Sequence, residues 1–152
     1  MATRFDYDVI VVGIDFSAPS REALARAADL AARVGARLEI IHVVRRFKAA
    51  LPFSKGNRAK VAQIQKAEIA RARSKLEKWK PRRRGLEVRA HVRTGVPSEG
   101  IIKHAEQIGA DLIVLSNLGH NSFEEILIGS TAERCLRATR VPVLLVPHGG
   151  ER

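Results

Sequence analysis

Mostly apolar runs of five to eight residues recur along the chain. They occupy residues 8–15, 37–44, 111–115 and 141–147 and are rich in Val, Ile and Leu. Such runs are typical of strands buried on both faces, as in a parallel sheet. Residues 86–92 instead alternate strictly between apolar and polar side chains, which predicts a strand with one wetter face.

The segments between these runs carry helix signals. Ser17 and Pro19 mark the start of a first helix, and Gly35 stands where a glycine often follows the last helical turn. Further helices are expected at about 58–80, ended by Pro81, at 97–108, and from Ser130 onward.

Strands that alternate with helices predict an α/β fold, a three-layer α/β/α sandwich around a five-stranded parallel sheet. Right-handed crossovers make this arrangement Rossmann-like. We find no internal repeat and interpret residues 1–152 as a single domain. Ligands of such sheets bind beyond the carboxyl ends of the strands, where the strand order reverses. This directs attention to Asp15, Val43, Gly95 and the loop after Leu115.

Composition narrows the class of protein. With 45% apolar residues the chain is not generally disordered, and 152 residues suffice for a real core. The single cysteine, Cys135, excludes an intramolecular disulfide framework and fits a reducing compartment. The apolar runs are too short to span a bilayer, and residues 1–8 do not resemble a signal peptide. These features predict a cytoplasmic protein without a transmembrane segment.

The formal net charge of +11 comes from one segment. Residues 45–84 hold 15 Lys and Arg against two acids, whereas the remainder of the chain is close to neutral. This basic insert (residues 45–84) is either a solvated helix face or a surface for an anionic partner such as RNA, a ribosome, an acidic protein or a membrane surface. Only Trp79, Phe47 and Phe53 accompany the charge, so nucleic-acid binding is not favoured.

Residues 116–131 are the strongest candidate for chemistry. They lie between a buried strand and a helix, with Gly119 and Gly129 ten positions apart and Ser130 opening the helix. Backbone N–H groups at a helix start, with glycine allowing close approach, form an anion site. The alternative is structural, because Ser130-Thr131-Ala132-Glu133 also fits a capping box and the glycines fit turns.

The other polar candidates have structural explanations as well. Asp15 is either a ligand group or a turn and helix-cap residue. His42 fits a core or interface histidine, and His91, His104, His120 and His148 show no metal-ligand spacing. No catalytic triad or carboxylate pair is evident, so spacing indicates neither a catalytic residue nor a metal site.

Six segments carry a resemblance to a known family. They are Gly-Ile-Asp-Phe-Ser at 13–17, Ile-Ile-His-Val at 40–43, Thr-Gly-Val-Pro at 94–97, Gly-Ala-Asp-Leu-Ile-Val-Leu at 109–115, Leu-Ile-Gly-Ser-Thr-Ala-Glu-Arg at 127–134 and Val-Pro-Val-Leu-Leu-Val at 141–146. In order and spacing they resemble the universal stress proteins over essentially the whole chain. The resemblance implies their adenine nucleotide alpha-hydrolase-like fold.

The ATP-binding branch of that family carries G-x2-G-x9-G-[ST]. Gly119, Gly129 and Ser130 match it, while Ser116 replaces the first glycine. By resemblance, the glycine-flanked segment would hold the phosphates of ATP, with or without Mg, and the first two strand ends would contact adenine or ribose. The implied ATP-binding residues are Gly13, Ile14, Asp15, Val43, Ser116, Gly119, Gly129, Ser130 and Thr131. The resemblance also implies a homodimer formed through the last strand, from Val141 to Val146.

Three functional hypotheses follow. The first is an adenine-nucleotide-binding regulatory protein of the stress response, with at most weak ATPase activity. The second is a scaffold without nucleotide that binds an anionic partner through the basic insert. The third is an enzyme of a related adenosine-binding α/β family, which would require a catalytic carboxylate.

Overall fold

A single parallel sheet organises the computed structural model, which describes residues 6–47, 55–118 and 128–148. Its spatial order is β3-β2-β1-β4-β5, and all four strand pairs are parallel. The strands are β1 (Val9–Gly13), β2 (Arg37–Val44), β3 (Val88–Thr94), β4 (Leu112–Ser116) and β5 (Val143–Val146). The expected five-stranded parallel sheet is therefore confirmed.

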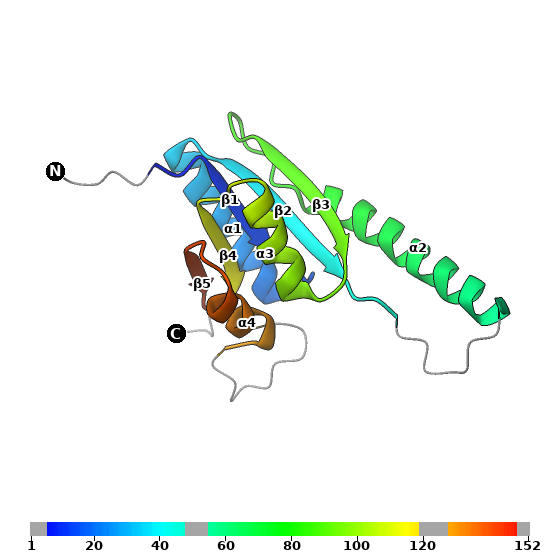
Figure 1. The fold of residues 1–152 in the computed structure, drawn as a ribbon. Coiled ribbons are helices and arrows are strands. Elements are labelled where there is room, and N and C mark those ends of the chain that lie inside the picture. The colour runs from blue at the N-terminus through cyan, green and yellow to red at the C-terminus, as the bar shows by residue number, and fades with distance from the viewer. Residues whose placement is uncertain (1–5, 48–54, 119–127, 149–152) are drawn as a thin grey trace.

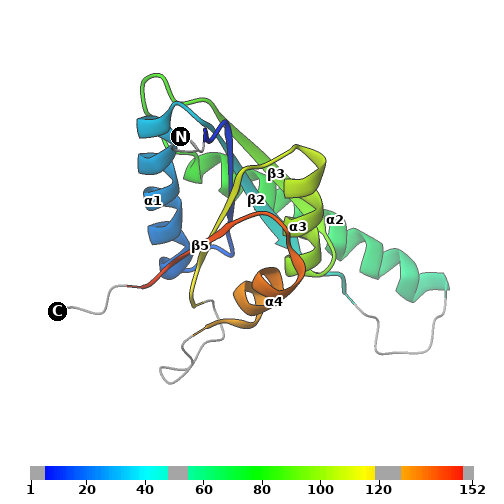
Figure 2. The ribbon, with the colours of Figure 1, turned by 60° about the vertical axis from the view of Figure 1, so that its left-hand side comes forward.

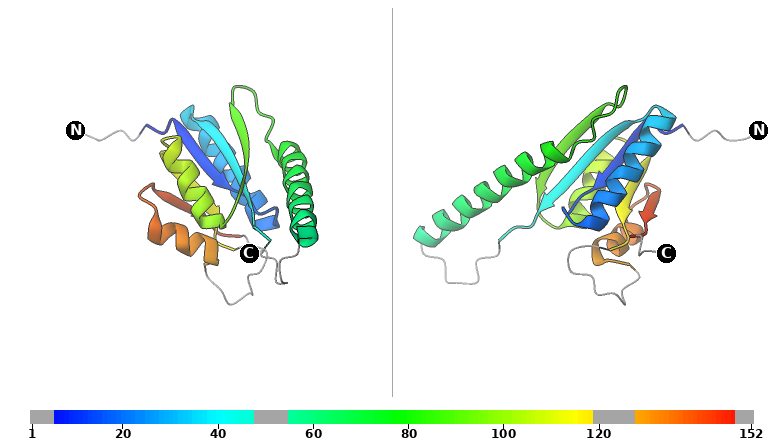
Figure 3. Two further views of the ribbon diagram at one scale, coloured as in Figure 1. Left: turned by 45° about the vertical axis from the view of Figure 1, so that its right-hand side comes forward. Right: turned by 180° about the vertical axis from the view of Figure 1, so that it is seen from behind.

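Within the described residues, four helices cover the two faces of this sheet. They are α1 (Ala18–Val34), α2 (Lys55–Trp79), α3 (Pro97–Gln107) and α4 (Ser130–Ala138). Figures 1 and 3 show α1 and α3 on opposite faces of the sheet. In Figure 2, α3 and α4 lie together on one side of β5 and α1 lies on the other. This is the predicted three-layer sandwich.

Alternation along the central strand divides the core in two. Ile10 and Val12 of β1 pack in a cluster with α1, whereas Val11 packs in a second cluster with α3 and α4. All five residues of β1 are buried, as expected for a strand covered on both faces. The strand that was predicted to have a wetter face, β3, is only partly buried along most of its length.

The boundaries of α1 follow from its cap residues. The Ser17 hydroxyl accepts a hydrogen bond from the backbone N–H of Ser20 at 3.2 Å, which satisfies one of the first unpaired donors of the helix. Gly35 ends the helix with φ of 77°, a left-handed conformation that favours glycine. Both sequence predictions for this helix are confirmed.

Helix α2 packs on the sheet through its second half only. Ala72 and Leu76 are buried, Leu76 joins the α1 cluster, and Trp79 packs against it. Ile64, which sequence periodicity placed on the same apolar stripe, is exposed. The first half of α2 extends beyond the sheet (Figures 1 and 3). In the described part of the chain, no helix is both long and apolar enough to cross a membrane.

Candidate functional site

The main cavity lies at the carboxyl ends of β1, β2 and β4. The chain proceeds from β1 outward to β2 and β3, then crosses back to β4 on the other side of β1, so the strand order reverses between β1 and β4. The chain segments that follow two adjacent strands run to opposite faces of the sheet at such a point, and they leave a crevice between them. The cavity there has a volume of about 760 Å³, within the range of small-ligand sites.

One wall is the turn that follows β1. Gly13, Ile14, Asp15 and Phe16 line the cavity. The Asp15 carboxylate accepts hydrogen bonds from the backbone N–H of Ser17, at 3.0 Å, and from the Ser17 hydroxyl. Asp15 therefore performs the turn role weighed from sequence while also facing the cavity.

Phe16 is a backbone outlier in this wall. Its φ is 64°, a left-handed value that is strained for a bulky side chain, and among the described residues other than glycine it stands alone in this. Its ring packs 4.5 Å from the His42 ring and meets Trp79 edge-on at 5.2 Å between centroids. Backbone strain held in place by packing is a feature of ligand-binding sites.

His42 extends the same wall from β2. Its ring nitrogen Nδ1 lies 2.7 Å from the Ile14 carbonyl oxygen, to which it can donate a hydrogen bond. This agrees with the expected satisfied histidine, but the residue also lines the cavity, which sequence reasoning missed. Val43, the β2 residue that sequence reasoning selected, lines the cavity beside it.

Gly13 has a packing reason of its own. A Cβ at this position would lie 2.6 Å from Leu115 Cδ2 and 2.9 Å from Ile101 Cδ1. Both neighbours are buried, so the absent side chain lets β4 and α3 approach β1. The glycine is thus explained without a ligand.

The opposite wall runs from the end of β4 to the start of α4. Ser116 ends β4, and its hydroxyl donates a hydrogen bond to the Leu118 carbonyl oxygen at 2.6 Å. Ser116 does not have a positive φ, so the serine in place of glycine causes no backbone strain there. The backbone N–H of Gly129 donates to the Asn117 carbonyl at 2.6 Å, which ties the two segments together.

The capping box at Ser130, the structural alternative considered from the sequence, does not form. Gly129 occupies the N-cap position of α4, no side chain caps this end, and the Glu133 carboxylate pairs with Arg137. Because Gly129 has an ordinary φ of −69°, its backbone conformation does not require glycine. Ser130 and Thr131 therefore open the helix at the cavity wall, where the positive end of the helix dipole favours an anion.

The third wall comes from the basic insert. Arg45, Arg46, Arg71 and Lys75 line the cavity with Glu68, which is paired with Arg71 at 2.8 Å. Lys75 also places its ammonium group 4.6 Å from the centre of the Phe16 ring. Sequence analysis did not assign these cations to the site.

Helical spacing could have identified two of them. Arg71 and Lys75 each precede a buried residue of α2 by one position, Ala72 and Leu76 respectively, so they flank the face that packs on the sheet. The Gln65 side chain holds the start of the insert against the helix, because its Oε1 accepts from the Phe47 N–H at 3.1 Å.

Eight of the nine predicted ligand-binding residues line this one cavity. They are Gly13, Ile14, Asp15, Val43, Ser116, Gly129, Ser130 and Thr131. The ninth, Gly119, lies outside the described residues. The structure thus gathers the predicted residues at one crevice, together with cations that were not predicted.

The fold and crevice define an α/β protein with a phosphate-compatible site at the reversal point of a parallel sheet. Residues 6–147 match the family described as "Universal stress protein family". The chain is 33% identical to Universal stress protein MJ0531 of Methanocaldococcus jannaschii over 148 residues, covering 92% of this chain and 82% of that protein. It belongs to the universal stress protein family.

Solved structures agree in fold. Universal stress protein UspA from Lactobacillus plantarum superposes with a TM-score of 0.77 at 24% identity, over 92% of this chain and 97% of that one. A universal stress protein in complex with cAMP matches with a TM-score of 0.59 at 26% identity, over 93% and 98% of the two chains. The fold is therefore the Rossmann-like, adenine nucleotide alpha-hydrolase-like sandwich.

Proposed function

We propose that this protein binds an adenine nucleotide, with ATP as the leading candidate, in the cavity between β1, β4 and α2. The main support for this proposal is that the amino-terminal end of α4 and the side chains of Arg71 and Lys75 line the same cavity. Phosphate groups are commonly bound by backbone N–H donors at the start of a helix together with Arg and Lys side chains. The relative solved with cAMP supports an adenine nucleotide as the ligand class.

Each wall takes a part in this proposal. The turn after β1, with Asp15, and the backbone at Val43 would contact ribose and adenine. Gly129, Ser130 and Thr131 would hold phosphate, and Mg²⁺ would enter bound to a di- or triphosphate. Phe16 and His42 give the cavity two aromatic rings, tilted by 41° to each other, and a base could stack on one of them.

Binding without efficient catalysis fits the acids of the described cavity. Asp15 accepts two hydrogen bonds from Ser17, and Glu68 is engaged by Arg71. Each of these carboxylates is held by a neighbouring side chain, and we infer that neither is positioned as the general base of an efficient hydrolysis. We therefore propose a regulatory binding protein of the stress response, with slow ATP hydrolysis at most.

Isothermal titration with ATP, ADP, AMP and cAMP tests the proposal. Affinity should rise with the number of phosphates and fall with salt, because the cations recognise charge. Lys75→Ala should weaken ATP binding, whereas Arg73→Ala, an exposed neighbour on the same helix outside the cavity, serves as the matched control. No binding at millimolar ATP, or equal effects of the two variants, would contradict it.

The projecting half of α2 favours a second candidate function. Arg58, Lys60 and Lys66 are exposed on it, beyond the sheet. This surface suits an acidic partner, with RNA as the simplest probe. Salt-dependent RNA binding that ATP leaves unchanged would support the scaffold function, and RNA binding that disappears in physiological salt would count against it.

We also propose that two copies pair through β5. Within the described residues this strand pairs with β4 alone, so its other edge is available. Leu144 on β5 and Leu136 on α4 are exposed, at 41% and 43%. An edge strand with apolar neighbours invites pairing with a second copy.

A further inference from the structure

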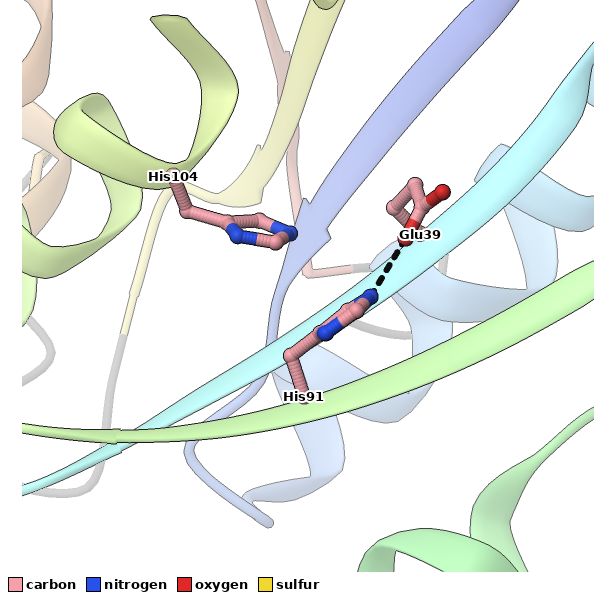
Figure 4. A group of neighbouring side chains, drawn as sticks. All are labelled: Glu39, His91 and His104. Carbon is pink, nitrogen blue, oxygen red and sulfur yellow. Dashed lines mark hydrogen bonds and ion pairs between the residues drawn. The ribbon is translucent and has the colours of Figure 1, made fainter. Parts of the chain in front are cut away.

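A second cluster of polar side chains lies away from the cavity, on the α3 face of β2 and β3. Glu39 comes from β2, His91 from the adjacent β3, and His104 from α3 above them. Figure 4 shows the two imidazole rings turned toward each other with the Glu39 carboxylate beside them. None of the three lines the cavity of the proposed nucleotide site.

The three side chains are close enough to share one ion. One ligand atom from each residue lies within 4.8 Å of the other two. His91 Nε2 is 2.5 Å from Glu39 Oε2, and the His91 and His104 ring centroids are 4.4 Å apart. Two imidazoles and a carboxylate are the ligand types that zinc prefers in three-residue sites with an open fourth position.

His104 gives the independent reason to look for a ligand. It is 2% exposed, and neither ring nitrogen has a hydrogen-bond partner among the described residues. Buried polar atoms are normally satisfied, so an orphaned imidazole needs an explanation. Burial, the charge of His91 and that of Arg93 lower its pKa to about 4, against the opposing effect of Glu39. The ring is therefore neutral at pH 7, with a lone pair available to a metal.

The charges around the cluster act in both directions. Arg37 donates its Nε–H to Glu39 Oε1 at 2.5 Å, which holds one oxygen and leaves Oε2 on the side of His91. Burial would raise the pKa of Glu39, but the hydrogen bonds from Arg37 and His91 and their charges lower it overall, so the ligand is ionised. Carboxylate ligands are commonly oriented by such an outer partner.

Arg89 and Arg93 oppose a cation. Arg89 lies 4.0 Å from Glu39 Oε1 but makes its short contact, 2.6 Å, with Glu87, and its side chain is half-exposed. Water screens an exposed charge strongly, whereas ligand bonds act at contact distance. Both arginines are exposed, so we expect them to lower the affinity for a cation and not to abolish it.

We propose that Glu39, His91 and His104 bind a single divalent transition-metal ion, with zinc the best fit to the ligand set. For zinc, His91 Nε2 and Glu39 Oε2 would separate to about 3.3 Å, since two bonds of about 2 Å meet at a tetrahedral angle. Water could fill the fourth position, since His91 is partly exposed. The bound ion would fasten α3 to β2 and β3.

Metal titration of the untagged 152-residue chain, freed of metal with a chelator, tests this site. Co²⁺ alone should bind one per chain with the visible absorption of a four-coordinate ion, and Zn²⁺ should displace it. His104→Leu and His91→Gln should each weaken binding by at least about tenfold. His148→Gln is the matched control, because His148 lies 3.1 Å from Glu22 in a similar pair, outside the three-ligand cluster.

Circular dichroism should show that the variants remain folded, and His91→Gln, at a partly exposed position, serves if His104→Leu does not fold. Failure of the wild-type protein to bind Co²⁺ or Zn²⁺ at about 100 µM would overturn the proposal. Equal binding by wild type and both cluster variants would overturn it too, because the ion would then sit elsewhere. The assay contains no nucleotide, so its outcome is separate from that of the proposed ATP site.

Discussion

Mild acid should destabilise this protein through His104, and leucine at that position should remove the effect. The folded-state pKa of His104 is about 4, below its ordinary 6.5. The folded protein therefore binds fewer protons than the unfolded chain between these values, and stability is lost as the pH falls from about 6.5 toward 4. The charges that act on the ring are those of His91 and Arg93 of β3 and Glu39 of β2, and Arg37 and Arg89 lie beside the Glu39 carboxylate.

The magnitude follows from the size of the shift. A difference of about 2.5 pKa units corresponds to about 3 kcal/mol once the pH is below both values. Between pH 7 and pH 5 the same two values give a loss of about 2 kcal/mol in the free energy of unfolding. The pKa of Glu39 is lowered from 4.5, so its own contribution is lost only as the pH falls below this interval.

Urea unfolding at pH 7, 6 and 5, in the presence of a chelator, measures the effect. The wild-type protein should lose about 2 kcal/mol more than His104→Leu across this interval. The variant should be at least as stable at pH 7, because leucine removes two buried nitrogens that have no partner in the described structure. His148→Gln should follow the wild-type curve. Parallel curves for wild type and His104→Leu would refute the reasoning.

Three further predictions concern packing, the ligand and assembly. Gly13→Ala should lower the free energy of unfolding by about 1–3 kcal/mol in urea, because the new Cβ would overlap Leu115; unchanged stability would mean that Leu115 moves freely. Gly129→Val should weaken ATP affinity by roughly tenfold or more in calorimetry by filling the phosphate space, and undiminished affinity would place the phosphates elsewhere. Leu144→Arg should convert a dimer to a monomer in sedimentation at micromolar concentration, and a wild-type monomer would contradict pairing through β5.

Hydrophobic patterns and helix-cap residues predicted the strands and helices well. Strand β2 has the predicted bounds, and Gly35 ends α1 as expected, because both depend on patterns within a few residues. Strands β1 and β5 are shorter than their apolar runs, because only residues 9–13 and 143–146 are paired in register with neighbouring strands. The capping box failed because Gly129, one residue earlier, takes the N-cap position.

The site was predicted only in part, because some of its residues are brought together by contacts between elements that are distant in the sequence. The family motifs and the strand ends marked eight cavity residues, but Arg71 and Lys75 reach the cavity only because α2 docks on β2 and β3. The cluster of Glu39, His91 and His104 could not be predicted from the spacing of these residues in the sequence, for the same reason. Glu39 and His91 lie 52 residues apart in the chain and meet only through the register of β2 with β3.

Helix α2 serves two environments at once. Its second half packs on the sheet through Ala72 and Leu76, while its first half extends beyond the sheet and carries the exposed Arg58, Lys60 and Lys66. A continuous helix transmits a tilt at one end to the other, so a ligand that draws Lys75 inward would also reposition that cationic arm. If a partner on the arm favours one tilt, nucleotide and partner must alter each other's affinity by the same factor. The basic residues of α2 would then couple nucleotide binding in the cavity to the binding of a partner outside it.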